Sequence, residues 1–166
     1  MFDMNRRTFV TSLGIGGTAL AGIGALKRRR ESQPEYREGN RVVSTREDVQ
    51  LQVTQEPIHL GDLVKYRVTN TGDSVHVLGC GNPWALEKQV EGDWKQVVWT
   101  GKRVPRMCAT ELSPGETFEE RIELSKSGLE EHAEEGQTDL SPGLSRLLIL
   151  GVSPILAAEF DVVEPT

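Results

Sequence analysis

From residue 45 onward, the hydrophobic positions fall into short runs that alternate with polar residues and are separated by turn residues. The run Val49-Gln50-Leu51-Gln52-Val53 alternates strictly, which is typical of a strand with one buried face. Similar runs predict further strands over 63–68, 75–78, 84–90, 94–99, 117–124, 146–152 and 155–163. About eight strands at spacings near ten residues indicate an all-β sandwich or barrel.

The segments between these runs carry turn signals. Glu91-Gly92-Asp93 predicts a hairpin turn between two strands. The string Leu-Ser-Pro-Gly occurs at 112–115 and again at 140–143. Pro-Gly suits the central positions of a type II turn, because proline presets φ and glycine accepts a positive φ. One short acidic segment, 128–135, has helical spacing and is expected to connect strands at the end of the sandwich.

The first residues resemble a twin-arginine export signal. The pair Arg6-Arg7 is followed by Phe9 and by a weakly hydrophobic, glycine-rich stretch over 9–26. Its glycines disfavour a buried helix, and its length lies at the short end for a membrane span. The resemblance implies export by the twin-arginine pathway to the cell surface or the medium.

The small residues Ala19 and Ala21 mark a candidate cleavage site. An uncleaved signal that anchors the chain in the membrane stays open as an alternative. We therefore expect a signal peptide or anchor over 1–26, a flexible charged tether over 27–44 and the sandwich over 45–164.

Charge is divided unevenly along the chain, whose formal net charge is −6. Residues 1–30 hold six basic residues and one acidic residue, which leaves 13 basic and 24 acidic residues, a net −11, for the remainder. This acidic balance argues against nucleic acid as a partner. It also suits solubility at high salt, where repulsion between exposed charges is screened, so we expect a high-salt-adapted protein.

Several motifs in the strand region resemble the bacterial Ig-like domains of secreted proteins. The matching stretches are Tyr66-Arg67-Val68-Thr69-Asn70-Thr71-Gly72, Trp84-Ala85-Leu86-Glu87-Lys88, Gly92-Asp93-Trp94-Lys95 and Leu112-Ser113-Pro114-Gly115-Glu116. The resemblance covers roughly 45–164 and implies an antiparallel Ig-like β-sandwich of about seven or eight strands. It further implies a binding or spacer module, with no catalytic residues and no cofactor.

Cys80 and Cys108 are the only cysteines. In an exported protein such a pair most simply forms a disulfide, although two free buried thiols remain an alternative. A blue-copper site would use His76, Met107 and Cys108 as ligand types. Cupredoxins, however, place a histidine and a methionine shortly after the cysteine, and here the next histidine is His132. We therefore expect no metal site.

Trp84, Trp94 and Trp99 lie on two adjacent predicted strands. We expect one or two of them in the core, and an exposed one would mark a binding face.

Three functional hypotheses follow. The first is a non-enzymatic exported module that binds an unknown protein or cell-surface component and meets the membrane only through an uncleaved leader. The second is an Ig-like proteinase inhibitor that uses the segment 100–110. The third is a cupredoxin-like metal or redox protein.

Overall fold

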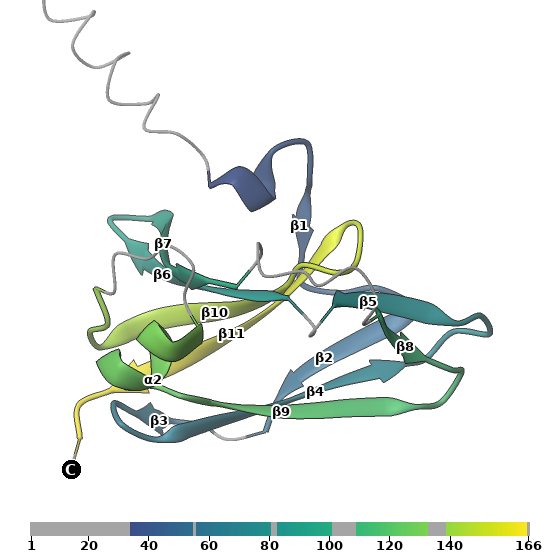
Figure 1. Cartoon of the computed structure of the whole chain (residues 1–166). Coiled ribbons are helices and arrows are strands. Elements are labelled where there is room, and N and C mark those ends of the chain that lie inside the picture. The colour runs from purple at the N-terminus through teal and green to yellow at the C-terminus, as the bar shows by residue number, and fades with distance from the viewer. Residues whose placement is uncertain (1–33, 55, 81–82, 101–108, 133–138, 166) are drawn as a thin grey trace, which may run out of the picture. The chain divides into compact units, whose positions relative to one another are not determined.

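The computed structural model describes residues 34–54, 56–80, 83–100, 109–132 and 139–165. The predicted signal peptide or anchor over 1–26 therefore lies outside the described residues. This includes Arg6, Arg7, Phe9, Ala19 and Ala21. Most of the described chain is strand, which confirms the all-β prediction (Figure 1). No helix in the described ranges is long and apolar enough to cross a membrane.

Strands of this part of the chain form three sheets. The large sheet has the order β1-β11-β10-β6-β7, with β3 also paired to β11; its strands are β1 (Val42–Val43), β3 (Ile58–His59), β6 (Trp84–Val90), β7 (Asp93–Trp99), β10 (Gly143–Ile149) and β11 (Ile155–Val163). The small sheet has the order β2-β4-β9, with β2 (Val49–Val53), β4 (Leu63–Asn70) and β9 (Thr117–Glu123). The third pairs β5 (His76–Cys80) with β8 (Ala109–Leu112).

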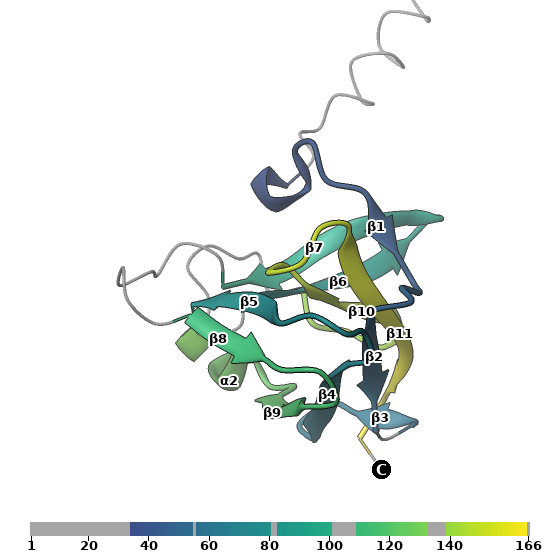
Figure 2. The same cartoon turned by 90° about the vertical axis from the view of Figure 1, so that its right-hand side faces the viewer.

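The sheets pack around one main core. In Figure 2 the small sheet lies on one side, β6, β7, β10 and β11 lie on the other, and β5 and β8 lie between them at one edge. Alternation along β4 buries Val64, Tyr66 and Val68 and exposes the residues between them. These side chains contact Leu86, Leu147 and other inner residues of the large sheet. The pattern that predicted half-buried strands is therefore the one that builds the sandwich.

The turns explain where several strands begin and end. Glu91 and Gly92 have φ values of 53° and 88°, and two consecutive positive φ values are those of a type I′ hairpin turn. The expected type II turn also forms at Pro114-Gly115, since Gly115 has φ 81° and Glu116 N–H donates to Ser113 O at 2.9 Å. Strand β10 begins and ends three residues earlier than the predicted 146–152. After it, Gly151 lies against the carbonyl of Leu78, where any Cβ would stand 1.8 Å from that oxygen.

The predicted tether over 27–44 is wrong for its described part. Residues 34–43 form the 3-10 helix η1 (Glu35–Arg37) and β1, which runs parallel to β11. In Figures 1 and 2 this segment lies on the far side of the large sheet from β4 and β9. Tyr36 is buried there against Trp99 and close to Ala85, Leu148 and Ile155, a second apolar cluster. The short helix α2 (Lys126–His132) follows β9, close to the predicted 128–135.

Candidate functional site

The outer face of the large sheet carries a buried ionic cluster, which we call the Glu87 cluster: Tyr36, Arg37, Glu87 and Arg146. Glu87 on β6 pairs in register with Arg146 on β10, and its side chain is 0% exposed. Tyr36 Oη donates to Glu87 Oε1 at 2.8 Å and Arg146 Nε donates to Oε2 at 2.7 Å. Arg37 Nη2 also bonds to Oε2. The carboxylate is thus fully engaged.

A buried carboxylate is tolerated only when charged partners and hydrogen bonds replace its lost water. Burial, followed by the charge and hydrogen bond of Glu87, raises the pKa of Tyr36 well above its usual range, so the phenol keeps its proton and donates. Two of the four members come from the segment over 34–43 and two from the sheet. The Glu87 cluster therefore holds this segment on the sheet.

The structure separates the three tryptophans. Trp84 and Trp99 are 2% and 7% exposed, and each belongs to a different apolar cluster. Trp94 is half-buried, pairs with Gln89, and stacks under the Arg146 guanidinium at 4.1 Å from its ring centroid. The three side chains therefore do not share one exposed face.

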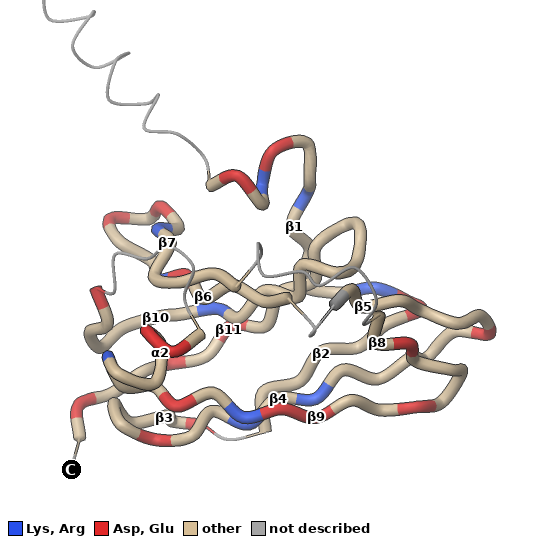
Figure 3. Tube along the Cα trace, viewed as in Figure 1, with Lys and Arg blue, Asp and Glu red and all other residues tan. Residues whose placement is uncertain are grey.

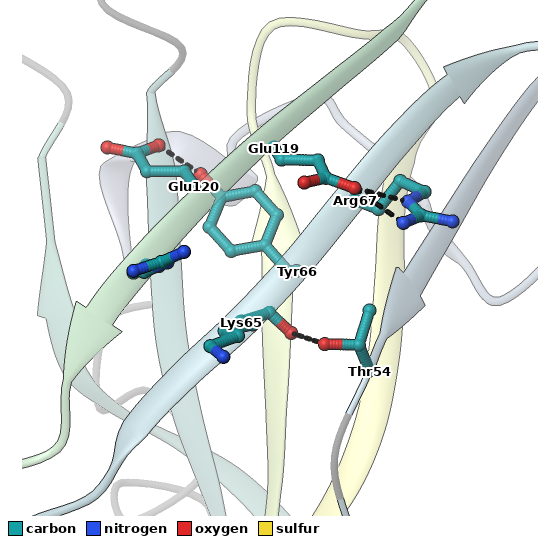
Figure 4. A pocket seen from close by; sticks show the side chains of 7 residues that line it. Thr54, Lys65, Tyr66, Arg67, Glu119 and Glu120 are labelled. Carbon is teal, nitrogen blue, oxygen red and sulfur yellow. Dashed lines mark hydrogen bonds and ion pairs between the residues drawn. The ribbon is translucent and has the colours of Figure 1, made fainter.

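The outer face of the small sheet is open. Its exposed or half-exposed positions are Gln50, Gln52, Thr54, Leu63, Lys65, Arg67, Thr69, Thr117, Glu119, Arg121 and Glu123. A cavity of about 390 Å³, which we call the β4–β9 groove, lies along it and is lined by Thr54, Lys65, Tyr66, Arg67, Glu119, Glu120 and Arg121. Figure 4 shows the side chains that line this groove.

Charges in the β4–β9 groove are arranged by strand register. Arg67 lies opposite Glu119, and its Nε donates to Glu119 Oε1 at 2.8 Å. Tyr66 lies opposite Glu120 and its hydroxyl donates to Glu120 Oε2. Figure 3 shows the resulting neighbourhood of basic and acidic positions along β4 and β9. Basic and acidic side chains therefore line this groove together.

Two of the three histidines have carboxylate neighbours, and the third, His132, has its ring centroid 6.0 Å from that of Trp84. His76 Nε2 lies 3.1 Å from Asp48 Oδ2, and His59 Nδ1 lies 3.3 Å from Asp62 Oδ2. His59 lies in β3. Within the described ranges, no group of three or more His, Cys, Asp or Glu side chains fits a metal ion. Met107 lies outside those ranges.

The predicted disulfide remains a prediction, since Cys108 also lies outside the described residues. Its partner Cys80 ends β5 opposite Ala109, which directly follows Cys108 in the chain. The segment 100–110 of the inhibitor hypothesis is described only at Thr100, Ala109 and Thr110.

Sequence reasoning missed the Glu87 cluster and the groove. The signal for the cluster is a lone acid, Glu87, in the apolar start of β6, matched by Arg146 at the edge of the apolar run of β10. The signal for the groove is the alternation of charges along β4 and β9, which shows that Lys65, Arg67 and Arg121 face outward but not which of them lie opposite one another.

A sandwich of packed, mostly antiparallel sheets is the architecture of Ig-like binding or structural modules. The chain belongs to the bacterial Ig-like domain family, whose family model matches residues 45–137. The matched part ends before β10 and β11, which complete the large sheet. A search of curated proteins found no match.

Solved structures with some likeness include a β-glucosidase from Listeria innocua in complex with glucose, at 16% identity and a TM-score of 0.36. The match covers 69% of this chain and 16% of the β-glucosidase chain. Another is the alkylpurine DNA glycosylase AlkC of Pseudomonas fluorescens, at 19% identity, a TM-score of 0.34, and 72% and 31% coverage. The sulfur carrier protein SoxY of Chlorobium limicola gives 10% identity, a TM-score of 0.32, and 90% and 100% coverage. Likenesses this weak bear on neither activity nor ligand.

Proposed function

We propose that this chain is an exported, non-enzymatic Ig-like module of a high-salt-adapted organism, and that it binds a protein or cell-surface component. The observation that supports a binding role is the difference between its sheets. The segment over 34–43 covers the outer face of the large sheet, whereas the outer face of the small sheet stays open and polar. The proposed binding surface is therefore the small sheet with its β4–β9 groove.

Export is supported by the leader, with Arg6-Arg7 and Phe9 before a weakly hydrophobic stretch. We expect the wild-type chain in the medium or the cell envelope, and the R6K/R7K double variant inside the cell. Fractionation followed by immunoblotting measures this, and equal export of both would remove the twin-arginine proposal. The intact mass of the exported protein, with and without reductant, reports cleavage near Ala21 and the Cys80–Cys108 bond.

High-salt adaptation is supported by the net −11 of the chain after residue 30, where 24 acidic residues stand against 13 basic ones. Repulsion among these charges weakens as salt screens it. We expect the thermal midpoint of the protein to rise with NaCl concentration to about 1 M and beyond. A midpoint that is already maximal at low ionic strength would contradict this part of the proposal.

Binding is tested with labelled full-length chain and envelopes of the producing cells. The variant Gln52→Trp places a bulky ring on the open face of the small sheet, and Gln89→Trp makes the same change on β6, near the β6–β7 hairpin. We expect Q52W to lower envelope binding about tenfold, as loss of a central contact does, and Q89W to leave it unchanged. Equal binding by both variants would move the binding surface away from the small sheet.

A further inference from the structure

Two cations of the β4–β9 groove face each other. Lys65 on β4 and Arg121 on β9 are directly opposite in register, both are exposed, and both line the groove. Like charges directly opposite each other destabilise a sheet. Such a pair therefore calls for a compensating anion.

The carboxylates that line the groove are already engaged. Glu119 pairs with Arg67, with 2.5 Å between Arg67 Nη2 and Glu119 Oε1. Glu120 accepts the Tyr66 hydroxyl. Within the described residues, no carboxylate lies within ion-pair distance of Lys65 or Arg121. In a chain of net charge −6, this leaves two neighbouring positive charges beside an open cavity.

The surroundings of the cation pair are polar and hold few apolar groups. The row beside it places Gln52, Arg67 and Glu119 next to one another, and the following row places Gln50, Thr69 and Thr117 together. Amide and hydroxyl groups in such rows suit hydroxyl-rich ligands, because both donate and accept hydrogen bonds.

A protein partner calls for a different surface. Protein interfaces are anchored by aromatic and large apolar side chains at their centre. Leu63, at 46% exposure, is the one exposed large apolar residue among the described positions of this face. The polar rows and the cation pair together therefore favour a charged sugar polymer over a protein.

We propose that the β4–β9 groove binds an acidic polysaccharide. A carboxylate of the sugar lies between Lys65 and Arg121, and neighbouring hydroxyls of the sugar form hydrogen bonds with the side chains of Thr54 and Gln52. This inference rests on the proposed binding role of the small sheet and names its ligand class. Arginine suits this task because its guanidinium donates two parallel hydrogen bonds to a carboxylate. The lysine adds a point charge across the strand.

The test uses the full-length chain and polygalacturonate as the probe, with calorimetry at about 0.15 M and about 1 M NaCl. We expect saturable binding that weakens at the higher salt, and no binding of neutral dextran. The double variant K65Q/R121Q should bind at least about tenfold more weakly, since it loses charge-assisted hydrogen bonds. The control variant Lys126→Gln removes one exposed charge on α2 and should bind as the wild type does.

Each outcome decides the matter. Unchanged binding by K65Q/R121Q, or no binding of polygalacturonate by the wild type, would overturn the proposal. Polyglutamate bound as tightly as polygalacturonate would also overturn it, in favour of an acidic protein partner. A thermal midpoint of the double variant at or above that of the wild type would show that the variant folds. Envelope binding that is sensitive to Q52W but not to K65Q/R121Q would uphold the binding surface while removing this ligand.

Discussion

The large and small sheets of this domain differ in whether their outer faces are covered. On β6, four consecutive residues from Trp84 to Glu87 are buried, so both faces of that strand are covered. On β4, burial alternates from Leu63 to Asn70, so one face meets water. The segment over 34–43 makes the difference, because Tyr36 and Val42 pack on the outer side of the large sheet.

The two faces also use ion pairs differently. Glu87 is buried with two arginines and a tyrosine, whereas the Arg67–Glu119 pair is 45% and 61% exposed at its side chains. Breaking a buried pair strands a charge away from water, while exposed pairs contribute little. Stability therefore depends more on the buried ion pairs of the covered face than on the exposed pair of the open face.

The largest expected effect comes from breaking the Glu87 cluster. Glu87→Ala leaves the Arg37 and Arg146 guanidinium groups next to each other without their carboxylate. We expect the free energy of unfolding to fall by about 3–5 kcal/mol, the usual result of removing one partner of a buried ion pair. Urea unfolding of the full-length chain, followed by tryptophan fluorescence, measures this change.

The matched control is Glu119→Ala on the open face. It breaks an ion pair of the same chemistry in water, so we expect a change of about 0–1 kcal/mol. Similar losses of unfolding free energy in E87A and E119A would mean that the buried and the exposed ion pairs contribute equally to stability.

A smaller change in unfolding free energy is expected when either of the two tyrosines that donate to carboxylates is replaced, and its size should differ between them. Tyr36→Phe removes a donor from the buried Glu87, and we expect a loss of about 1.5–3 kcal/mol, typical of a hydrogen bond to a charged group. Tyr66→Phe removes a donor from the half-buried Glu120, which water can reach, so we expect about 1 kcal/mol or less.

Alkaline unfolding supplies a second readout for Tyr36→Phe. Because folding raises the pKa of Tyr36, the contribution of this phenol to stability is fully present below its unfolded pKa of about 10 and is lost as pH rises from there toward the higher folded pKa. The stability of the wild type should therefore fall above about pH 10, and Y36F should reduce that fall. A fall in Y36F as steep as that of the wild type would contradict the assignment of this effect to the covered face.

The sequence predicted the open sheet better than the covered one. Strict alternation over 49–53 and 63–68 matches the one-sided burial of β2 and β4. The covered sheet depends on a contact with a distant segment, since Tyr36 reaches Glu87 across 51 positions of the chain. A periodic pattern depends only on residues that are close in the sequence. The isolated apolar residues Tyr36 and Val42 lie in a charged stretch, so this stretch was predicted to be a tether.

The sequence also did not predict the short strands or the pairs of residues that lie opposite each other on adjacent strands, for a related reason. β1 and β3 have only two residues each and exist because β11 offers them a parallel edge. The opposition of Lys65 and Arg121 follows from the register of β4 and β9, and register is set by the hydrophobic faces and turns together. A pattern along one strand carries no such information about the next.

The smallest expected effect concerns Arg46, which joins the two sides of the sandwich. It precedes β2 in the small sheet, and its Nη1 donates to the carbonyls of Ser153 and Pro154, between β10 and β11 of the large sheet, at 3.1 and 3.3 Å. Asp48 accepts from Arg46 Nε at 2.8 Å and from Nη2 at 2.6 Å, which fixes the guanidinium. This hydrogen bonding lowers the pKa of the Asp48 carboxyl.

Because the folded pKa of Asp48 is depressed, its contribution to stability is present above the unfolded value of about 4 and is lost as pH falls through the folded value. We expect Asp48→Asn to lower the urea midpoint slightly at pH 6 and to make its fall below about pH 4 shallower. The control Asp73→Asn removes the same charge from an exposed turn and should keep the wild-type slope. An unchanged slope in D48N would mean that Asp48 adds nothing to the link that Arg46 makes between the two sheets.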